Sequence, residues 1–521
     1  MWPPPVVKDK LFKSLSVKAF FGPILLVFIA LNGIAQNKNI LLNNQLLLDK
    51  IKGGWAGQLI GCALGGPYEH KFQSTLIPEN IAFSWSPDKL LLLFKNNPEL
   101  FDDLFLDMLF VETLEKKGLN ASAKDLGKAL SRAPFLLHHG LQMAKHNFLI
   151  GLKPPRTGHW LNNPHADDND FQKVADFIGL ISPGILPSVI KLGNRLGHLI
   201  ASGDGYYGGI YIASLYSLAF LYENPERMVE EALKIFPAKA NFTRVIQDVV
   251  DNYHRFPNNW QQNWQLIQKK WGEDIGCPEG VFKPSNFEAK INAAWITIGL
   301  LYGRGDFGRT LEITLRCGDD TDSNAASAGG LVGTILGFSK IPSPWKKGMK
   351  EVEFLKPKGM DISISEATDL SFKLALETIK KNKGKIENDK IFIPRPRFSS
   401  VPYEANFTNH SPSERRKLDL RLTEINSETT IEFEGSGFVI NGRIIKKGPE
   451  DHTYRVAIVI DGRLARVAVL PAHPLLRNPT PFFHFNLKPG NHRLFLQISE
   501  PSPKADIQLD ELIIYKKSLF K

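Results

Sequence analysis

Cysteine is scarce in this chain, whose 521 residues contain only three, Cys62, Cys277 and Cys317. Small exported domains that depend on disulfides are rich in cysteine, so the chain is not a disulfide scaffold, although one bridge remains open. None of the three has the His or Cys spacing of a zinc motif. Cys62 and Cys317 lie among glycine, alanine and apolar residues, which indicates small core side chains.

The sequence also lacks internal repeats, low-complexity tracts and a comfortable membrane span. Its N-terminal apolar run, "AFFGPILLVFIAL", is too short for one. Lysines precede this run and the small residues Gly33 and Ala35 follow it, which is the pattern of a secretory signal peptide. We therefore expect residues 1–35 to be removed near Ala35, with an uncleaved anchor as the alternative. The mature protein is expected to be secreted or periplasmic, without stable membrane association.

Charge of one sign does not dominate. The formal net charge is +10, and removal of four lysines and one aspartate with residues 1–35 leaves +7. Spread over the rest of the chain, this excess gives little reason to expect a nucleic-acid or membrane partner. We expect a small-molecule or glycan substrate and no nucleic acid.

Hydrophobic periodicity changes once along the chain. Residues 36–380 repeat apolar positions every three or four residues, which predicts an all-α domain. A lysine-rich, Pro-interrupted stretch at 381–397 reads as a linker. Residues 398–521 alternate in short runs separated by turns such as Asp461-Gly462, which predicts a β-sandwich. The fold class is thus multidomain α plus β, and the sandwich has either a carbohydrate-binding or a structural role.

Acidic residues gather at three places in the helical region. Asp102, Asp103 and Asp107 form the first cluster, the stretch 167–170 the second, and "GDDTDSNAASAGGLVG" the third. A single cluster of this kind is usually a solvated face or a helix cap. Three clusters in one apolar-rich domain favour a site for a hard divalent cation, Mg²⁺ above all, with Mn²⁺ or Ca²⁺ as alternatives.

Small residues follow Asp322 directly and explain part of the third cluster. The segment "NAASAGGLVGTILG" predicts a helix whose Ala and Gly face allows another backbone to approach closely. The positive end of its dipole would point at the carboxylates. We expect this helix to be buried at the centre of the domain, with cation ligands in its first turn.

With these acidic and small-residue motifs, the chain resembles the ADP-ribosylglycohydrolase family. Its members are all-α enzymes that hydrolyse ADP-ribosyl linkages with a pair of divalent metal ions. The motifs "GGWAGQLIGCALGGPYE", "FDDLFLDMLFVETLE", "GDGYYGGIYIASLYSLAF" and "GDDTDSNAASAGGLVGTILG" are similar to family motifs in the same order, over residues 45 to 345. The resemblance implies a metal site whose ligands are Asp102, Asp103, Asp320, Asp322 and Ser323.

The first metal motif departs from the family pattern. Phe101 and Leu104 stand where Ser or Thr is common, so at least one ligand is lost or replaced. Asp107 and the acids at 167–170 are additions that could rebuild the site.

The resemblance implies hydrolysis of a glycosidic bond by a metal-oriented sugar and a carboxylate-activated water. Because polysaccharides are abundant outside the cell, we expect a secreted hydrolase of a furanosyl-type bond in a glycan or glycoside. An ADP-ribosyl or riboside hydrolase and an inactive carbohydrate-binding protein are the alternatives.

Several further residues are candidates for this chemistry. The catalytic candidates are Glu69, Asp103 and Asp168, although Glu69 could equally be a helix-end charge. The substrate-binding candidates are Asp204, Tyr206, His165 and Asn292, and for the tyrosine and the histidine a structural role is at least as common.

Overall fold

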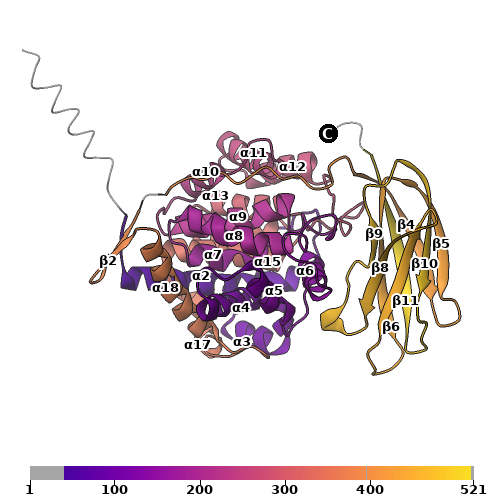
Figure 1. Ribbon diagram of the computed structural model, residues 1–521. Helices are drawn as coiled ribbons and strands as arrows, with labels where there is room; N and C mark the ends of the chain where they lie inside the picture. Colours follow the sequence, from indigo (N-terminus) through magenta and orange to yellow (C-terminus); the bar gives the residue numbers. More distant parts are fainter. Residues whose placement is uncertain (1–39, 395, 518–521) are drawn as a thin grey trace, which may run out of the picture.

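Helices make up most of the chain as far as Lys381 in the computed structural model, which describes residues 40–394 and 396–517 (Figure 1). The predicted signal peptide lies outside the described residues. Among the described helices, none is long and apolar enough to cross a membrane. The helices are α2 (Asn44–Gly65), α3 (Pro87–Asn96), α4 (Asp102–Lys117), α5 (Ala123–Ser131), α6 (His139–Leu149), α7 (Asp176–Leu180), α8 (Leu186–Ile200), α9 (Gly203–Ala219), α10 (Pro225–Leu233), α11 (Asn241–Arg255), α12 (Trp260–Trp271), α13 (Ala289–Gly303), α14 (Phe307–Arg316), α15 (Thr321–Leu336), α16 (Ser343–Lys346), α17 (Met349–Val352) and α18 (Ile364–Lys381).

Helices α2 and α15 pack backbone against backbone at the centre of this domain. A Cβ atom on Gly57 would come within 2.1 Å of the Gly329 carbonyl oxygen, and one on Gly61 within 1.9 Å of the Ala325 oxygen. No larger residue fits at these positions without moving a helix. The expected burial of the small-residue helix is therefore confirmed. The contact brings the C-terminal end of α2 beside the first turn of α15, where the acidic motif begins.

The C-terminal region is the expected β-sandwich. One antiparallel sheet has the strand order β5-β10-β7-β8 and the other the order β4-β11-β6-β9. Their inner faces share one hydrophobic core. The strands are β4 (Ser411–Leu422), β5 (Glu428–Gly435), β6 (Gly437–Lys446), β7 (Thr453–Ile460), β8 (Arg463–Pro471), β9 (Phe482–His484), β10 (Gly490–Ile498) and β11 (Ala505–Lys516).

Aromatic side chains that could have formed a sugar-stacking platform lie inside the sandwich or beneath it. Tyr454, Phe482 and Phe483 are all buried. Tyr454 belongs to the sandwich core, and Phe483 packs on the side that faces the helical domain. These residues hold the fold together and are not exposed for ligand binding.

The stretch expected as a linker is largely structured. It carries β2 (Lys385–Glu387) and β3 (Lys390–Ile393), and β3 pairs with β1 (Ile40–Asn43) in a three-stranded sheet. The chain then crosses the helical domain toward the sandwich (Figure 1). Along this path the Val401 amide donates to the Ile235 carbonyl at 2.9 Å, and Asn406 Nδ2 donates to Asp167 Oδ1 at 2.8 Å.

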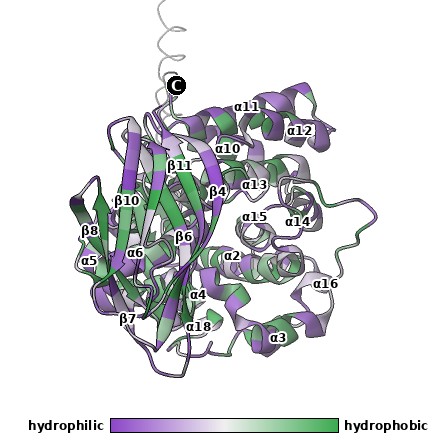
Figure 2. Ribbon diagram, turned by 90° about the vertical axis from the view of Figure 1, so that its right-hand side faces the viewer, coloured by the Kyte–Doolittle hydropathy of each residue, from purple (hydrophilic) through white to green (hydrophobic). Residues whose placement is uncertain are grey.

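The two domains are packed against each other through a shared apolar cluster. Trp160, from a loop of the helical domain, lies 5.3 Å from the Phe407 ring and 5.2 Å from the Phe485 ring. At the same junction Tyr515 donates a hydrogen bond to the Gly276 carbonyl at 2.9 Å. Figure 2 shows the sandwich seated beside the ends of the helices. The sandwich therefore packs directly against one side of the helical domain.

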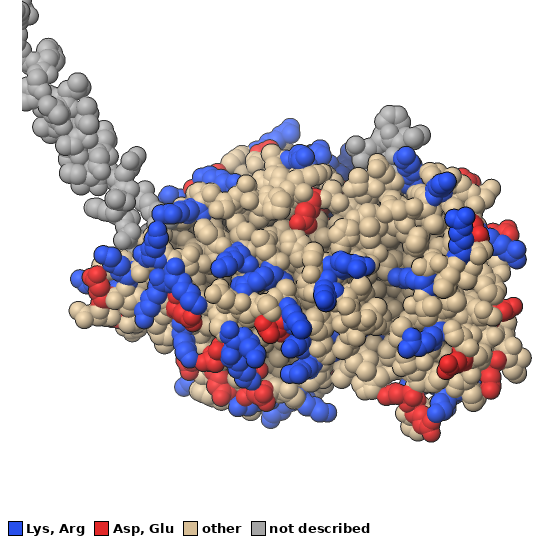
Figure 3. Space-filling model, in the orientation of Figure 1, with Lys and Arg blue, Asp and Glu red and all other residues tan. Residues whose placement is uncertain are grey.

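Charged side chains are mixed over the face drawn in Figure 3. Lysines and arginines are spread across both domains there, with acidic side chains among them. This distribution agrees with the modest net charge of the sequence.

Candidate active site

One cavity of about 580 Å³ opens where the α2–α15 pair ends. Its walls come from the turn after α2, the start of α4, the loop before α6, the turn around residues 169–173 and the first turn of α15. Five acidic side chains line it: Glu69, Glu99, Asp102, Asp320 and Asp322. This volume is typical of a small-molecule site.

Glu69, Asp320 and Asp322 form a group that fits a divalent cation. Each offers a carboxylate oxygen, and the three oxygens lie within 4.8 Å of one another. Oxygens around an octahedral Mg²⁺ are about 3 to 4 Å apart, given metal–oxygen distances of about 2.1 Å. Buried Asp322 Oδ1 has no hydrogen-bond partner among the described residues, so it is free to bind a cation. The residues present therefore fit one divalent metal ion.

Asp320 is held in place from two sides. Asn169 Nδ2 donates to Asp320 Oδ2 at 2.6 Å, and the Ser323 hydroxyl lies 3.0 Å from Asp320 Oδ1. The same hydroxyl lies 2.9 Å from Asp103 Oδ2. Three of the predicted metal ligands, Asp103, Asp320 and Ser323, are thus brought together.

Asp319, the first acid of the motif, is a structural residue. Its backbone is in the left-handed region, with φ of 58°. Its carboxylate accepts hydrogen bonds from the Ser74 amide at 2.7 Å and from Trp295 Nε1 at 2.8 Å. These contacts turn Asp319 away from the cavity and set the direction in which Asp320 enters it.

Lys173 places a positive charge among these carboxylates. It lies in a 3-10 turn, Gln172–Val174, and its Nζ is 3.2 Å from Asp103 Oδ1. Burial alone would lower its pKa, but Asp103, Asp102, Asp170 and Asp320 together raise the pKa well above its usual value. The lysine is therefore an ammonium ion at neutral pH.

Burial raises the pKa of the acids beside Lys173. The pKa of Asp102 is raised to about 6 and that of Asp103 is also raised, with desolvation as the main cause. Lys173 opposes both shifts and favours the ionised form of Asp103, its partner at 3.2 Å. Asp320 is the exception, because Lys173 and its hydrogen bonds outweigh burial and lower its pKa. Asp320 is accordingly the carboxylate that is most readily ionised for cation binding.

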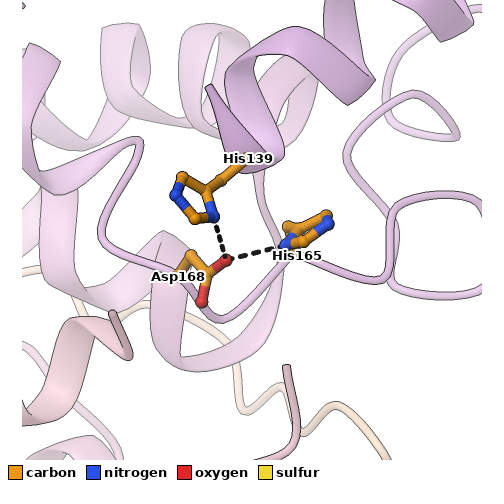
Figure 4. Close-up of side chains that lie close together, drawn as sticks. All are labelled: His139, His165 and Asp168. Carbon is orange, nitrogen blue, oxygen red and sulfur yellow. Dashed lines mark hydrogen bonds and ion pairs between the residues drawn. The ribbon is translucent and has the colours of Figure 1, made fainter. Parts of the chain in front are cut away.

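His139, His165 and Asp168 lie close together, and Figure 4 shows how their side chains face one another. His139, at the start of α6, lines the cavity, and its Nδ1 is 3.7 Å from Asp168 Oδ2. The same oxygen is 2.9 Å from His165 Nδ1, and His165 Nε2 is 2.8 Å from the Thr480 hydroxyl of the sandwich. Because both nitrogens of His165 already have partners, hydrogen bonds fix His165 and Asp168, and Asp168 lies directly behind His139.

The two histidines, His139 and His165, differ in how their surroundings shift the pKa. Burial lowers the pKa of His139 well below its usual value, so the ring facing the cavity is neutral. For His165, burial also favours the neutral ring, but the hydrogen bond with Asp168 outweighs it and raises the pKa.

Not every predicted site residue lines the cavity. Tyr206 and Asn292 are fully buried, with their polar groups bonded to Asn194 and to the Asn286 carbonyl. Asp204 caps α11 through the Phe242 amide at 3.2 Å. Direct substrate contact by these three residues does not agree with this geometry.

Asp168, His165 and Asp107 lie behind the cavity wall. Asp168 and His165 do not line the cavity, and His139, 3.7 Å from Asp168, stands between them and the cavity. Asp107 accepts a hydrogen bond from the Phe177 amide at 3.2 Å and, like Asp103, is not among the residues that line the cavity. The idea that Asp107 rebuilds the lost ligand position is therefore not supported.

Sequence reasoning missed several residues of the wall. Lys173, Asn169, His138, His139 and Phe287 all line the cavity. The adjacent pair His138-His139 was a visible signal, because imidazoles commonly serve as hydrogen-bonding or proton-transferring groups. Lys173 directly follows the acidic cluster at 167–170, but nothing in the sequence shows that its side chain turns toward other acids, and Phe287 stands in a stretch without a distinctive pattern.

Comparison with known proteins identifies relatives of the helical domain. The sequence profile of a family described as ADP-ribosylglycohydrolase matches residues 43–376. A solved structure titled "ADP-ribosylglycohydrolase-related protein complex" is 16% identical, with a TM-score of 0.44, over 64% of this chain and 99% of that chain.

A second solved structure is titled "A novel family GH115 4-O-Methyl-alpha-glucuronidase, BtGH115A, with specificity for decorated arabinogalactans". It is 10% identical, with a TM-score of 0.17, over 63% of this chain and 42% of that chain. No curated protein matches the chain.

Proposed function

The chain belongs to the ADP-ribosylglycohydrolase family, and from this premise we propose that it is a metal-dependent hydrolase of a furanosyl-type bond in a glycan or glycoside. The family supports a hydrolase acting on glycosidic bonds. The observation that carries the proposal is the group Glu69, Asp320 and Asp322, with Asp322 Oδ1 buried and unpartnered beside a cavity of substrate size.

Different residues of the cavity would bind the cation and accept a proton from water. Glu69, Asp320 and Asp322 would hold the cation, which when bound orients sugar hydroxyls and offsets developing charge. Asp102 lines the cavity and has a pKa of about 6, which suits a group that takes a proton from water near neutral pH. Asp102 therefore replaces Asp103 as the preferred general base, since Asp103 is engaged by Lys173 and Ser323.

The other wall of the cavity suits a sugar ring. The Phe287 ring lies 4.5 Å from the His139 ring and 5.2 Å from the His70 ring, and all three residues line the cavity. Aromatic faces of this kind commonly pack against the C–H face of a sugar. The neutral His139 can exchange hydrogen bonds with sugar hydroxyls.

The charge of the cavity favours a neutral glycoside over an ADP-ribosyl group. A diphosphate needs cationic or amide donors. Against five acids the lining offers Lys173, paired with Asp103, and His70, paired with Glu69, together with Asn97 and Asn169, the latter bonded to Asp320. An ADP-ribosyl or riboside hydrolase stays the second candidate because of the family. The N-terminal pattern further leads us to place the activity outside the cytoplasm.

A substrate screen tests the proposal. The purified protein is incubated with 4-nitrophenyl furanosides, plant oligosaccharides and ADP-ribosyl-arginine, each with EDTA or with added Mg²⁺ or Mn²⁺. The proposal expects metal-dependent release of a sugar from a glycoside. Hydrolysis of ADP-ribosyl-arginine alone would establish the second candidate. Binding of oligosaccharides without any turnover would establish a carbohydrate-binding protein.

A further inference from the structure

Lys173 is the unusual feature of the cavity. Its side chain is 13% exposed, and its Nζ lies 3.2 Å from Asp103 Oδ1. Of the described residues that line the cavity, it is the only lysine or arginine.

The turn that carries Lys173 is fixed at its beginning. Asn169 Nδ2 donates to Asp320 Oδ2 at 2.6 Å, and Asp170 Oδ2 accepts from the Gly140 amide at 2.8 Å. The backbone of the turn is thereby tied both to the acidic motif and to α6. This anchoring keeps the ammonium group within reach of Asp103.

Asp103, which lies behind Lys173, and Asp322, which lines the cavity, differ in how their carboxylates are satisfied. On one side, Asp103 Oδ1 contacts Lys173 and Asp103 Oδ2 accepts from the Ser323 hydroxyl at 2.9 Å. On the other side, Asp322 Oδ1 is buried without a partner, in a group of three oxygens within 4.8 Å. Asp103 Oδ1 likewise accepts no hydrogen bond, but it has the Lys173 ammonium group at 3.2 Å, so only the second side lacks a cation.

A second divalent ion beside Asp103 would meet the ammonium group at close range. Like charges repel strongly in a buried site, where water screens them poorly. An ammonium ion compensates carboxylates as a metal does, but it has no open coordination position for water or a sugar hydroxyl.

We propose that Lys173 is a built-in cation that occupies the Asp103 side of the cavity, so that the site binds one divalent metal ion, at Glu69, Asp320 and Asp322, instead of two. This inference rests on the metal site of the proposed function. Its consequence is that the substrate is oriented by a single metal ion, with a fixed charge opposite it.

Counting Mn²⁺ ions tests the proposal directly. Titration of the full-length protein with Mn²⁺, followed by calorimetry and by electron paramagnetic resonance, should give one ion per chain and the six-line spectrum of an isolated Mn²⁺. Lys173→Met removes the charge at nearly constant volume. It should raise the count to two and broaden the spectrum through coupling between neighbouring ions.

Lys145→Met is the matched control, because Lys145 is also buried but donates to a backbone carbonyl, that of Ala133, at 3.0 Å. This variant should keep a count of one. Two ions in the unaltered protein, or one ion in a folded Lys173→Met variant, would overturn the proposal. The first result needs no variant and leaves the hydrolase proposal intact, whereas absence of turnover with one bound ion would contradict the hydrolase proposal alone.

Discussion

At the scale of single residues, the acids of this chain have distinct tasks even though the sequence places them together. Asp319 anchors a loop through Ser74 and Trp295, Asp320 is readily ionised beside Lys173, and Asp322 is buried with an unpartnered oxygen. Neighbouring residues of one type thus differ because each faces a different environment.

Asp322→Asn tests the metal site at this scale. A cation at a hundred times its dissociation constant should add about 2.7 kcal/mol to the free energy of unfolding of the unaltered protein. The variant should lose this gain, while its metal-free form stays folded because repulsion with Asp320 is relieved. Thermal unfolding with Mg²⁺, Mn²⁺ or EDTA measures the difference.

Asp361→Asn serves as the control for this comparison, because Asp361 is an exposed aspartate far along the chain from the motif. It should retain the full metal-dependent stabilisation. An Asp322→Asn protein that responds to metal as the unaltered protein does would show that the cation binds elsewhere.

His146 in α6 is buried beside Leu476 of the sandwich, so its charge reports on the contact between the two domains. Burial lowers its pKa from 6.5 to about 4, so the unfolded chain binds a proton before the folded one does. The free energy of unfolding should therefore fall as pH drops from 6.5 toward 4, by about 1.4 kcal/mol per pH unit for this group. Urea unfolding at several pH values should show that His146→Gln lacks this contribution. An identical pH dependence in both proteins would contradict the burial.

At the scale of secondary-structure elements, the site depends on the contact between α2 and α15. Gly57→Ala should lower the free energy of unfolding by about 3 kcal/mol or more, because the new Cβ would lie 2.1 Å from the Gly329 carbonyl oxygen. Because the contact also sets the position of Asp320, the variant should weaken Mn²⁺ binding. Chemical unfolding and Mn²⁺ titration measure the two effects.

Gly308→Ala is the matched control in another helix. Its Cβ would lie 3.5 Å from the Trp345 ring, an ordinary contact, so stability should stay the same or rise by up to about 1 kcal/mol. Equal effects of the two substitutions would mean that helix propensity, and not the close approach, governs the α2–α15 pair.

The sequence predicted this element well but only part of the site. The small residues after Asp322 predicted a buried helix with carboxylates at its start, because an Ala and Gly face allows another helix backbone to approach closely. Lys173 could not be predicted, since a lysine in an unremarkable turn is normally solvated, and only the tertiary fold places it beside Asp103. Tyr206 and Asn292 were assigned to the cavity for a similar reason: periodicity does not tell which buried face adjoins a pocket.

At the scale of the whole molecule, the two domains behave as one packed body. The sequence at 381–397 suggested an exposed connection, yet β3 pairs with β1 there, a contact between residues far apart in the chain that no local pattern reveals. Beyond it, Trp160 packs against Phe407 and Phe485 across the junction.

Trp160→Ala tests this coupling. Loss of this buried tryptophan should lower the free energy of unfolding by about 3 to 5 kcal/mol. Because Trp160 packs between the domains, the substitution should weaken the contact between them. Differential scanning calorimetry should show one transition for the unaltered protein and two for the variant. Two separate transitions in the unaltered protein would show that the domains fold independently.

The central claim is that the acidic cavity is the active site of a metal-dependent glycoside hydrolase. Its most direct test is turnover of the best substrate from the screen by protein stripped with EDTA, then supplied with increasing Mg²⁺ or Mn²⁺, for the unaltered protein and for Asp322→Asn. The account predicts that activity returns with the metal in the unaltered protein and is absent from the variant at every metal concentration. Full activity in EDTA, or equal activity in the two proteins, would contradict it.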